Sequence, residues 1–390
     1  MTFHAHTLPD FPWDTLVPAR HKAAEHPQGA LDLTVGSPVD PTPQLALEAL
    51  SASADAHGYP PTLGTESLRS AIINWTRRRR SVNGDVDIML SIGSKETVAL
   101  LPSLLGFGRG DRIGFPSIAY PTYDVGTRLA GAEPVALDPA ADPETWPQDL
   151  AMVWLNSPSN PDGHVLSVAQ LRKIVAWAQA HGVVVASDEC YAELCWDVDY
   201  APSVLADEVC DGNTRGLLML YSLSKQSNMA GYRAAFMVGD PELVAPVLEI
   251  RKHAGFMLPS PVQHAMALML DDDTHVAEQA ARYRVRREKL LAALESAGLV
   301  NDPDNVAGLY LWAGEDPARA AAAGRDVVDA WALVNALAEL GIIVAPGTFY
   351  GAAGANRIRM SLTASDQVID QAVERLADLP QTLARHVEKL

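Results

Sequence analysis

The sequence predicts an α/β protein with a large three-layer lobe, built on a mostly parallel sheet, and a smaller α+β lobe. The chain has 390 residues, of which 48% are hydrophobic, which is enough for a large core and two lobes. Short apolar runs alternate with helical patterns through the middle of the chain, as is typical of a parallel sheet covered by helices on both faces. This alternation changes after about Leu270, where the second lobe is expected to begin.

The large lobe is predicted to contain seven strands. Their apolar runs cover residues 86–90, 112–115, 133–137, 151–155, 183–186, 217–221 and 234–238. Helical patterns cover residues 66–80, 95–105 and 167–181. In the last of these helices, Ser167 and Gln170 match a capping box, and Gly182 suits the C-terminal end. We interpret the basic run at the end of the first helix, Arg77 to Arg80, as solvated.

The remaining residues are predicted to form the small lobe. A long helix over 280–296 is followed by a strand (309–312), a helix (327–340), two strands (342–345 and 357–362) and a last helix. The N-terminal residues to about Thr42 are expected to pack with these elements. The predicted division is a large domain over 43–285 and a small domain formed by 1–42 and 286–390.

Composition narrows the possible partners. The net charge of −18, from 30 basic and 48 acidic residues, argues against nucleic acid and anionic membrane surfaces. We find no signal-peptide pattern and no apolar stretch long enough to span a bilayer. The three cysteines fit a reducing compartment better than a disulfide framework, so we expect a cytoplasmic protein.

The most informative segment runs from Tyr221 to Arg233. Lys225 follows a buried apolar run and is flanked by small hydroxyl residues, Ser222 and Ser224. A lysine that leaves a strand into the interior is costly unless its charge is removed or used. An imine with an aldehyde cofactor would remove the charge. The serines, with Arg233 eight residues after the lysine, are suited to holding a phosphate beside it.

This arrangement resembles the pyridoxal-phosphate lysine segment of the fold-type-I, class I/II aminotransferases. Four further segments match that family in its own order along the chain: residues 91–97, 115–123, 156–163 and 187–191. Alone, the first three are better explained as a capped helix start, a core tyrosine and a polar turn. Asp188, in the fourth, follows a run too apolar for a surface strand, which favours a functional role.

The resemblance implies that the large domain binds pyridoxal 5'-phosphate. It assigns these residues to the phosphate: Gly93, Ser94, Lys95, Ser222, Ser224 and Arg233. Tyr120 would stack on the pyridine ring, and Asp188 would keep the ring nitrogen protonated. Asn160 and Tyr191 would donate hydrogen bonds to the phenolic oxygen. Asp162 replaces the threonine usual in the family's turn, which leaves the assignment of Asn160 intact.

The resemblance also implies a substrate site and a homodimer. Arg359 matches the arginine that grips the substrate α-carboxylate, next to Asn160, while Arg357 is expected to be solvated. Gly36 resembles part of the N-terminal strap over the substrate. Tyr59 resembles a tyrosine that reaches the phosphate in the neighbouring subunit, so the site would lie at a dimer interface.

The expected activity is transamination through an imine of Lys225, with Asp188 and Tyr191 as further catalytic residues. Residues 251–263 are similar to bacterial N-succinyldiaminopimelate aminotransferases, which implies glutamate as donor and N-succinyl-2-amino-6-oxoheptanedioate as acceptor, in lysine biosynthesis. Such an acceptor needs cations beyond the α-carboxylate site. Arg251 and Lys252 are candidates, although a basic helix end that complements the helix dipole explains them equally well.

Other functions remain open. One alternative is an aminotransferase for aspartate, alanine or an aromatic donor. Another is a cofactor-dependent carbon–sulfur lyase, which would release pyruvate and ammonia without an oxo-acid acceptor. A cofactor-sensing DNA-binding regulator is disfavoured by the acidic charge. Glycine-rich residues 106–110 precede a strand rather than a helix, and the acidic residues 271–275 lack EF-hand spacing, so we expect neither a dinucleotide nor a metal.

Overall fold

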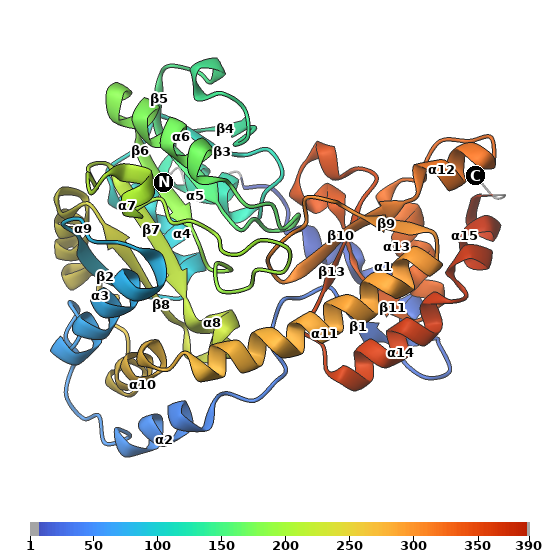
Figure 1. Cartoon of the computed structure of the whole chain (residues 1–390), viewed down its shortest axis with the longest axis horizontal. Coiled ribbons are helices and arrows are strands. Elements are labelled where there is room, and N and C mark those ends of the chain that lie inside the picture. Colours follow the sequence, from blue (N-terminus) through green and yellow to red (C-terminus); the bar gives the residue numbers. More distant parts are fainter. Residues whose placement is uncertain (1–7, 388–390) are drawn as a thin grey trace, which may run out of the picture.

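The computed structural model describes residues 8–387 (Figure 1). A large lobe contains the central sheet, and a smaller lobe contains the C-terminal part of the chain. The long helix α11 (Thr274–Ser296) runs continuously from one lobe to the other. None of the helices in the described part is both long and apolar enough to cross a membrane.

The large lobe is built on a seven-stranded sheet in the order β2-β8-β7-β6-β5-β3-β4. The strands are β2 (Asp87–Ile92), β3 (Arg112–Pro116), β4 (Glu133–Leu137), β5 (Leu150–Asn156), β6 (Val184–Asp188), β7 (Leu217–Ser222) and β8 (Ala234–Gly239). Only β8 runs antiparallel to its neighbours, so the predicted mostly parallel sheet is confirmed. Each strand begins and ends within two residues of its predicted bounds.

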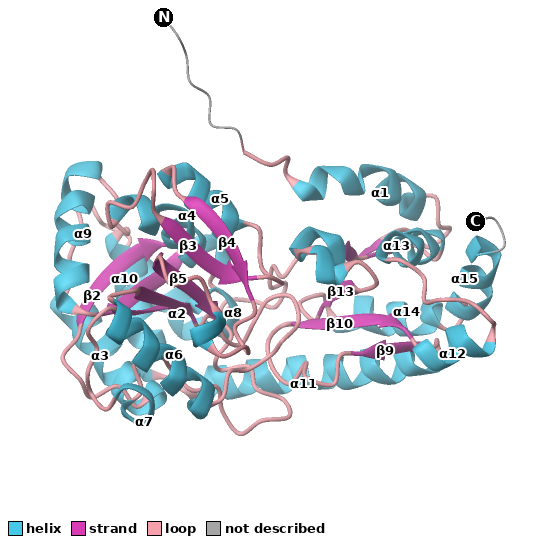
Figure 2. Cartoon of the chain, turned by 90° about the horizontal axis from the view of Figure 1, so that it is seen from above, coloured by secondary structure: helices cyan, strands magenta, loops and turns pink. Residues whose placement is uncertain are grey.

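Helices cover both faces of this sheet (Figure 2). They are α2 (Gln44–Ala52), α3 (Glu66–Arg80), α4 (Ser94–Leu104), α5 (Thr122–Ala130), α6 (Val168–His181), α7 (Asp207–Cys210), α8 (Leu223–Gln226), α9 (Pro241–Ala254) and α10 (Ser260–Asp271). Alternate residues of β5 point to opposite faces: Val153 packs in a core with α3, α6 and α10, whereas Trp154 packs with α4, α5 and α9. The result is the three-layer α/β lobe that the sequence predicts.

The predicted caps of α6 are present. The Ser167 hydroxyl accepts a hydrogen bond from Gln170 N–H, and Ser167 N–H donates to the Gln170 side chain at 2.9 Å. Gly182 ends the helix with a φ of 70°, which a glycine adopts without steric cost.

The small lobe combines an antiparallel sheet, β12-β13-β10-β9, with a short parallel pair, β1-β11. Its strands are β1 (Leu31–Asp32), β9 (Leu299–Asn301), β10 (Tyr310–Glu315), β11 (Ile342–Ile343), β12 (Ala345–Pro346) and β13 (Ile358–Ser361). Its helices are α1 (Val17–Ala24), α11, α12 (Pro317–Ala322), α13 (Ala330–Glu339), α14 (Asp366–Leu376) and α15 (Leu379–Val387). The N-terminal Leu16 and Leu33 share one core with Leu333 of α13. The division into two domains stays our proposal, and its boundary after residue 285 would cut α11.

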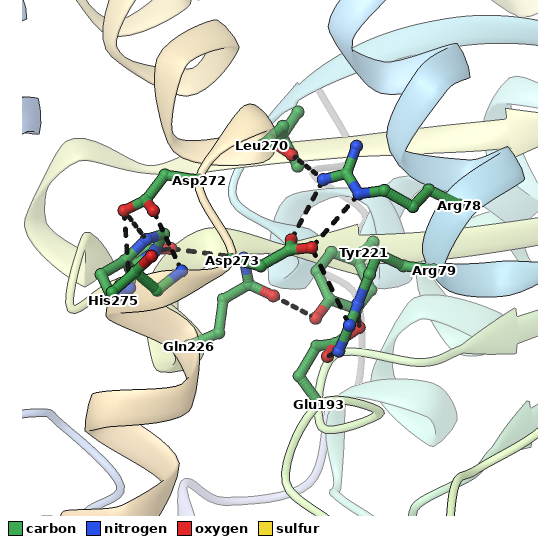
Figure 3. A network of polar contacts seen from close by, with 11 residues as sticks. Arg78, Arg79, Glu193, Tyr221, Gln226, Leu270, Asp272, Asp273 and His275 are labelled. Atoms are coloured by element: carbon green, nitrogen blue, oxygen red, sulfur yellow. Dashed lines mark hydrogen bonds and ion pairs between the residues drawn. The ribbon is translucent and has the colours of Figure 1, made fainter.

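The basic end of α3 is less solvated than predicted. Arg78 forms an ion pair with Asp273 at 3.0 Å, and Arg79 pairs with Glu193 (Figure 3). Arg80 is buried. The interpretation as a solvated helix end is therefore wrong for Arg80, because loops from distant parts of the chain fold over this end of α3.

Arg80→Ala is expected to destabilise the protein by about 3–5 kcal/mol. Arg80 and Glu189 form an ion pair of 2.6 Å in which both side chains are almost completely buried, so the substitution leaves an uncompensated carboxylate. Chemical denaturation of the variant measures the loss. Arg77→Ala, at an exposed residue of the same helix turn, is the matched control, and an equal effect of the two substitutions would contradict the prediction.

Candidate active site

A cavity of about 560 Å³ lies between the carboxyl ends of the large sheet and the small lobe. The strands β5, β6 and β7 end at Asn156, Asp188 and Ser222, which all line the cavity. Because the carboxyl ends of parallel strands meet at one edge, residues far apart in the sequence come together here. Twelve of the fourteen predicted site residues line the cavity: Gly36, Ser94, Lys95, Tyr120, Asn160, Asp188, Tyr191, Ser222, Ser224, Lys225, Arg233 and Arg359.

An anion cradle is formed at the start of α4. Gly93 precedes Ser94, the first helical residue, with a φ of 78°. The Gly93 N–H donates to the Arg233 carbonyl at 2.8 Å, and a Cβ at Gly93 would collide with the Arg233 guanidinium. The hydroxyls of Ser222 and Ser224 lie 2.8 Å apart in the same cavity. A guanidinium, two hydroxyls and a helix N-terminus suit a phosphate group.

Asp188 is an acid held away from water. Its carboxylate accepts hydrogen bonds from the Tyr123 hydroxyl and the Cys190 N–H, both at 3.2 Å, and has no cationic partner among residues 8–387. Burial raises the pKa of the Asp188 carboxyl. Such an acid is suited to accept a hydrogen bond from a protonated ring nitrogen. Sequence reasoning missed Tyr123, although it closes the same segment that supplied Tyr120.

Lys225 projects into the cavity from α8, directly after β7. Its Nζ donates a hydrogen bond to the carbonyl of Gly36, so the amine meets the N-terminal strap. Burial lowers the pKa of the Lys225 amine. A largely buried amine with a lowered pKa loses its proton readily and is suited to act as a nucleophile or a base.

Arg359, on β13, is buried and incompletely paired. Its two terminal nitrogens donate to the Asn160 side chain (2.9 Å) and to the Thr34 carbonyl, while its Nε has no partner. The guanidinium carbon lies 3.9 Å from the centroid of the Tyr310 ring and 4.9 Å from that of Tyr350. Because no carboxylate of the described residues pairs with Arg359, this guanidinium is suited to receive one from a substrate.

Two predicted residues lie outside the cavity lining. Gly93 does not line the cavity itself, but its N–H donates to the Arg233 carbonyl and its missing Cβ leaves room for the Arg233 guanidinium. Tyr59, in the loop before α3, is 94% exposed. Its predicted role requires a second copy of the chain and stays a prediction.

The candidate role of Arg251 and Lys252 in binding distal carboxylates is wrong, since neither lines the cavity. Arg251 is buried and pairs with Glu96 at 2.7 Å, and the exposed Lys252 pairs with Glu249. Both lie in the last turn of α9, as the alternative of a basic helix end predicted. A basic pair has the same sequence pattern in a helix end and in a binding site, so tertiary contacts decide between them.

Sequence reasoning also missed one wall of the cavity. Phe11 and Trp13, at the 3-10 helix η1 (Pro12–Leu16), lie beside Tyr120, and the ring centroids of Trp13 and Tyr120 are 6.0 Å apart. Lys95 Nζ lies 5.4 Å from the Tyr120 centroid and 5.9 Å from the Phe11 centroid. Tyr310 of β10 completes the wall near Arg359. The close spacing of Phe11 and Trp13 was the only hint in the sequence of an aromatic wall, but no local motif marks these two residues as site residues.

Comparisons with known proteins agree with the geometry. The family model for aminotransferase class I and II matches residues 28–376. The chain is 48% identical to the 4-dedimethylamino-4-oxo-anhydrotetracycline transaminase of Streptomyces rimosus, over 95% of this chain and 99% of that protein. It is 50% identical to a probable aminotransferase of Mycobacterium tuberculosis, over 95% and 85% respectively.

Solved structures show the same fold. A probable N-succinyldiaminopimelate aminotransferase of Thermus thermophilus superposes with a TM-score of 0.82 and 26% identity, covering 95% of this chain and all of that chain (100%). Aminotransferases of this class generally depend on pyridoxal phosphate, and the cradle, the buried acid and the buried lysine fit that cofactor. The chain therefore belongs to the class I and II aminotransferases.

Proposed function

We propose that this aminotransferase takes an amino group from glutamate and transfers it to N-succinyl-2-amino-6-oxoheptanedioate, in the biosynthesis of diaminopimelate and lysine. The charge of the cavity carries this proposal. Beside Arg359, the cavity is lined by Lys95, which forms no ion pair with a described residue. Arg20 also lines the cavity but is already paired with Asp32 at 2.6 Å. The family resemblance assigns Lys95 to the cofactor phosphate; we propose instead that Lys95, whose Nζ lies over the Tyr120 and Phe11 rings, serves as the second anchor of an acceptor with several carboxylates.

The donor set suits pyridoxal 5'-phosphate. The phosphate would be held by Ser94, Ser222, Ser224 and Arg233, and Gly93, which lacks a Cβ, would leave room for the Arg233 guanidinium beside it. Tyr120 would lie against the ring, Asp188 would accept from the ring nitrogen, and Asn160 and Tyr191 would donate to the phenolic oxygen. When bound, the cofactor withdraws electrons from the substrate carbon that loses its proton.

The chain's own residues would then orient the substrate and move its proton. Arg359 holds the α-carboxylate through parallel hydrogen bonds, which satisfies its free Nε and directs the Cα–H toward Lys225. The Lys225 amine takes the proton from Cα. Phe11 and Trp13 line the cavity beside Tyr120.

A second candidate acceptor is a flat polycyclic ketone. One wall of the cavity is aromatic, because Phe11, Trp13 and Tyr120 line it. The Trp13 ring also packs against Phe349 and Tyr350, with ring centroids 5.4 and 6.3 Å away. Such a wall suits stacking on a planar body. The relative from Streptomyces rimosus is named as a 4-dedimethylamino-4-oxo-anhydrotetracycline transaminase.

The substitution Lys95→Gln distinguishes the succinylated acceptor from a polycyclic ketone. The substitution is expected to raise the KM for the succinylated acceptor by about tenfold, the effect of losing roughly 1.4 kcal/mol of charge-assisted binding. The KM for pyruvate, which lacks a distal carboxylate, should change by less than about twofold. Initial rates with glutamate as donor measure both. Lys173→Gln, at an exposed lysine of α6, is the matched control.

The outcomes are distinct. Turnover of the succinylated acceptor by the wild type, weakened selectively in Lys95→Gln, supports the first candidate. Turnover of a polycyclic ketone alone supports the second. Equal losses with all acceptors would place Lys95 at the cofactor rather than at the distal carboxylate.

We also infer a homodimer in the cytoplasm. Tyr59 is 94% exposed in the single chain, which supports an assembly in which a second copy covers this ring. In that dimer the Tyr59 side chain of one copy would reach the cavity of the other copy. The three cysteines are free thiols, which suits a reducing compartment. Sedimentation of the wild type and of Tyr59→Phe tests the assembly.

A further inference from the structure

The N-terminal strap, residues 34–42, leads from the substrate corner of the cavity to the long helix α11. Its residues 35–37 line the cavity. At the first end of the strap, the Thr34 carbonyl accepts a hydrogen bond from the Arg359 guanidinium. The position of the strap therefore bears directly on the place proposed for the substrate carboxylate.

The other end of the strap is held by one face of α11 through Asp40. Arg286 donates from its two terminal nitrogens to the two carboxylate oxygens of Asp40, at 2.8 and 2.7 Å. Gln279 Nε2 donates to the same carboxylate at 2.8 Å. Gln279 and Arg286 are both buried and lie seven residues apart, so they share one face of the helix.

The same face of α11 also holds the lysine segment, residues 225–228. The Gln279 side-chain oxygen accepts a hydrogen bond from Asn228 Nδ2 at 2.9 Å. One turn earlier, His275 Nε2 lies 2.7 Å from the Ser227 hydroxyl oxygen. The segment that carries Lys225 is thereby docked on α11 by two buried polar contacts.

Gln279 is the residue that contacts both parts. The oxygen of its amide faces the lysine segment and the nitrogen faces the strap, and because the Asp40 carboxylate only accepts, this orientation of the amide is fixed. A direct bond adds to the bridge, since the Thr42 hydroxyl donates to the Asn228 carbonyl at 2.9 Å. A buried polar network whose members are all paired favours one relative arrangement of the segments that it joins.

We propose that Gln279 is a positioning residue for substrate binding. By joining Asp40 of the strap to Asn228 of the lysine segment, it keeps residues 35–37 in place beside a substrate whose carboxylate is held by Arg359. The strap is then ordered before the substrate arrives, so binding loses less conformational freedom. The inference rests on the proposed substrate site and adds a residue outside the cavity lining that sets its affinity.

Gln279→Met removes both hydrogen bonds and keeps the length of the side chain. The KM for glutamate is expected to rise by about tenfold while kcat changes by less than about threefold, the pattern of a lost binding contribution. The dissociation constant of glutarate, an unreactive dicarboxylate, should rise by about tenfold in calorimetry, which needs no turnover. Gln179→Met is the matched control, because the Gln179 amide on α6 donates to the carbonyls of Asn213 and Arg215, away from the cavity.

Asp40→Asn tests whether Gln279 acts through the strap. This substitution should weaken glutamate and glutarate in the same way, and the double variant should lose little more than the larger single loss, because both changes break one bridge. Thr42→Val removes the direct bond from the strap to Asn228 at a half-buried residue. It should also raise the KM, and it tests the same tie if Gln279→Met does not fold.

The outcomes separate positioning from packing. A purely structural role of Gln279 would lower the melting temperature and the fraction of active enzyme, but would leave the KM and the glutarate affinity of the folded enzyme unchanged. Unchanged values in Gln279→Met or in Asp40→Asn, or losses that multiply in the double variant, would overturn the inference. Failure of the proposed function would show separately, as a wild type without transamination.

Discussion

Lys225→Ala is expected to abolish transamination, with a fall in kcat of more than about 10⁴-fold, at the upper end of the effect of a general base. The substitution removes the only lysine amine among the lining residues of the described cavity that donates to the Gly36 carbonyl. Burial lowers the pKa of the Lys225 amine, which suits this amine to move a proton. No other lining residue combines an amine at Gly36 with a lowered pKa. Stopped-flow and steady-state assays with glutamate as donor measure the loss.

Two controls distinguish this result from misfolding. Lys252→Ala removes an exposed lysine outside the cavity and should keep full activity. Borohydride treatment of the loaded wild type should leave the cofactor attached to the peptide that contains Lys225, and the variant should carry no label. Full activity of Lys225→Ala would refute the proposed role of this residue.

Arg359→Lys is expected to lower kcat/KM for every amino donor by about 10²–10³-fold, equivalent to the roughly 3–4 kcal/mol of a buried, charge-assisted carboxylate contact. A lysine keeps the positive charge but cannot form two parallel hydrogen bonds. It would also leave the Asn160 side chain and the Thr34 carbonyl without their present donors. Kinetics with donors of different side chains measure the effect.

Arg357→Lys is the matched control for Arg359→Lys. Arg357 is half-buried just before β13, donates to the Val300 carbonyl at 3.3 Å and does not line the cavity. Its substitution should change kcat/KM by less than about twofold. A larger loss in Arg357→Lys than in Arg359→Lys would mean that the two arginines have been assigned the wrong way round.

Residues next to a strong local signal were predicted to lie at the edge of the sheet, and they line the cavity. Asp188 and Lys225 each follow an apolar run that becomes a buried strand, β6 or β7, so a polar residue directly after the run had to lie at the edge of the sheet. Asn160, after β5, was assigned instead from the resemblance of its turn to the family's turn. The order of the segments along the chain added specificity, because the lysine segment and four further segments occur in the same order as in one family.

Residues whose partners are distant were predicted poorly. Arg80 and Arg251 were interpreted as surface charges or candidate ligands, yet each is buried against a carboxylate from a remote segment, Glu189 or Glu96. A basic residue near a helix end has the same local pattern whether or not an acid folds over it. The sequence predicted Tyr310 only as part of a strand, because its spatial neighbours Gly36 and Arg359 are far from it in the sequence.

The sequence by itself determined the class of protein: alternating apolar runs predict the sheet, and the resemblance of five segments to one family predicts the chemistry. Only the tertiary structure decided which charges are compensated and which are free. Two buried arginines, Arg251 and Arg359, end in an ion pair and in a cavity respectively. The physical reason is that hydrophobic periodicity is a local property, whereas the free energy of a buried charge depends on every group that folding brings within a few ångströms of it.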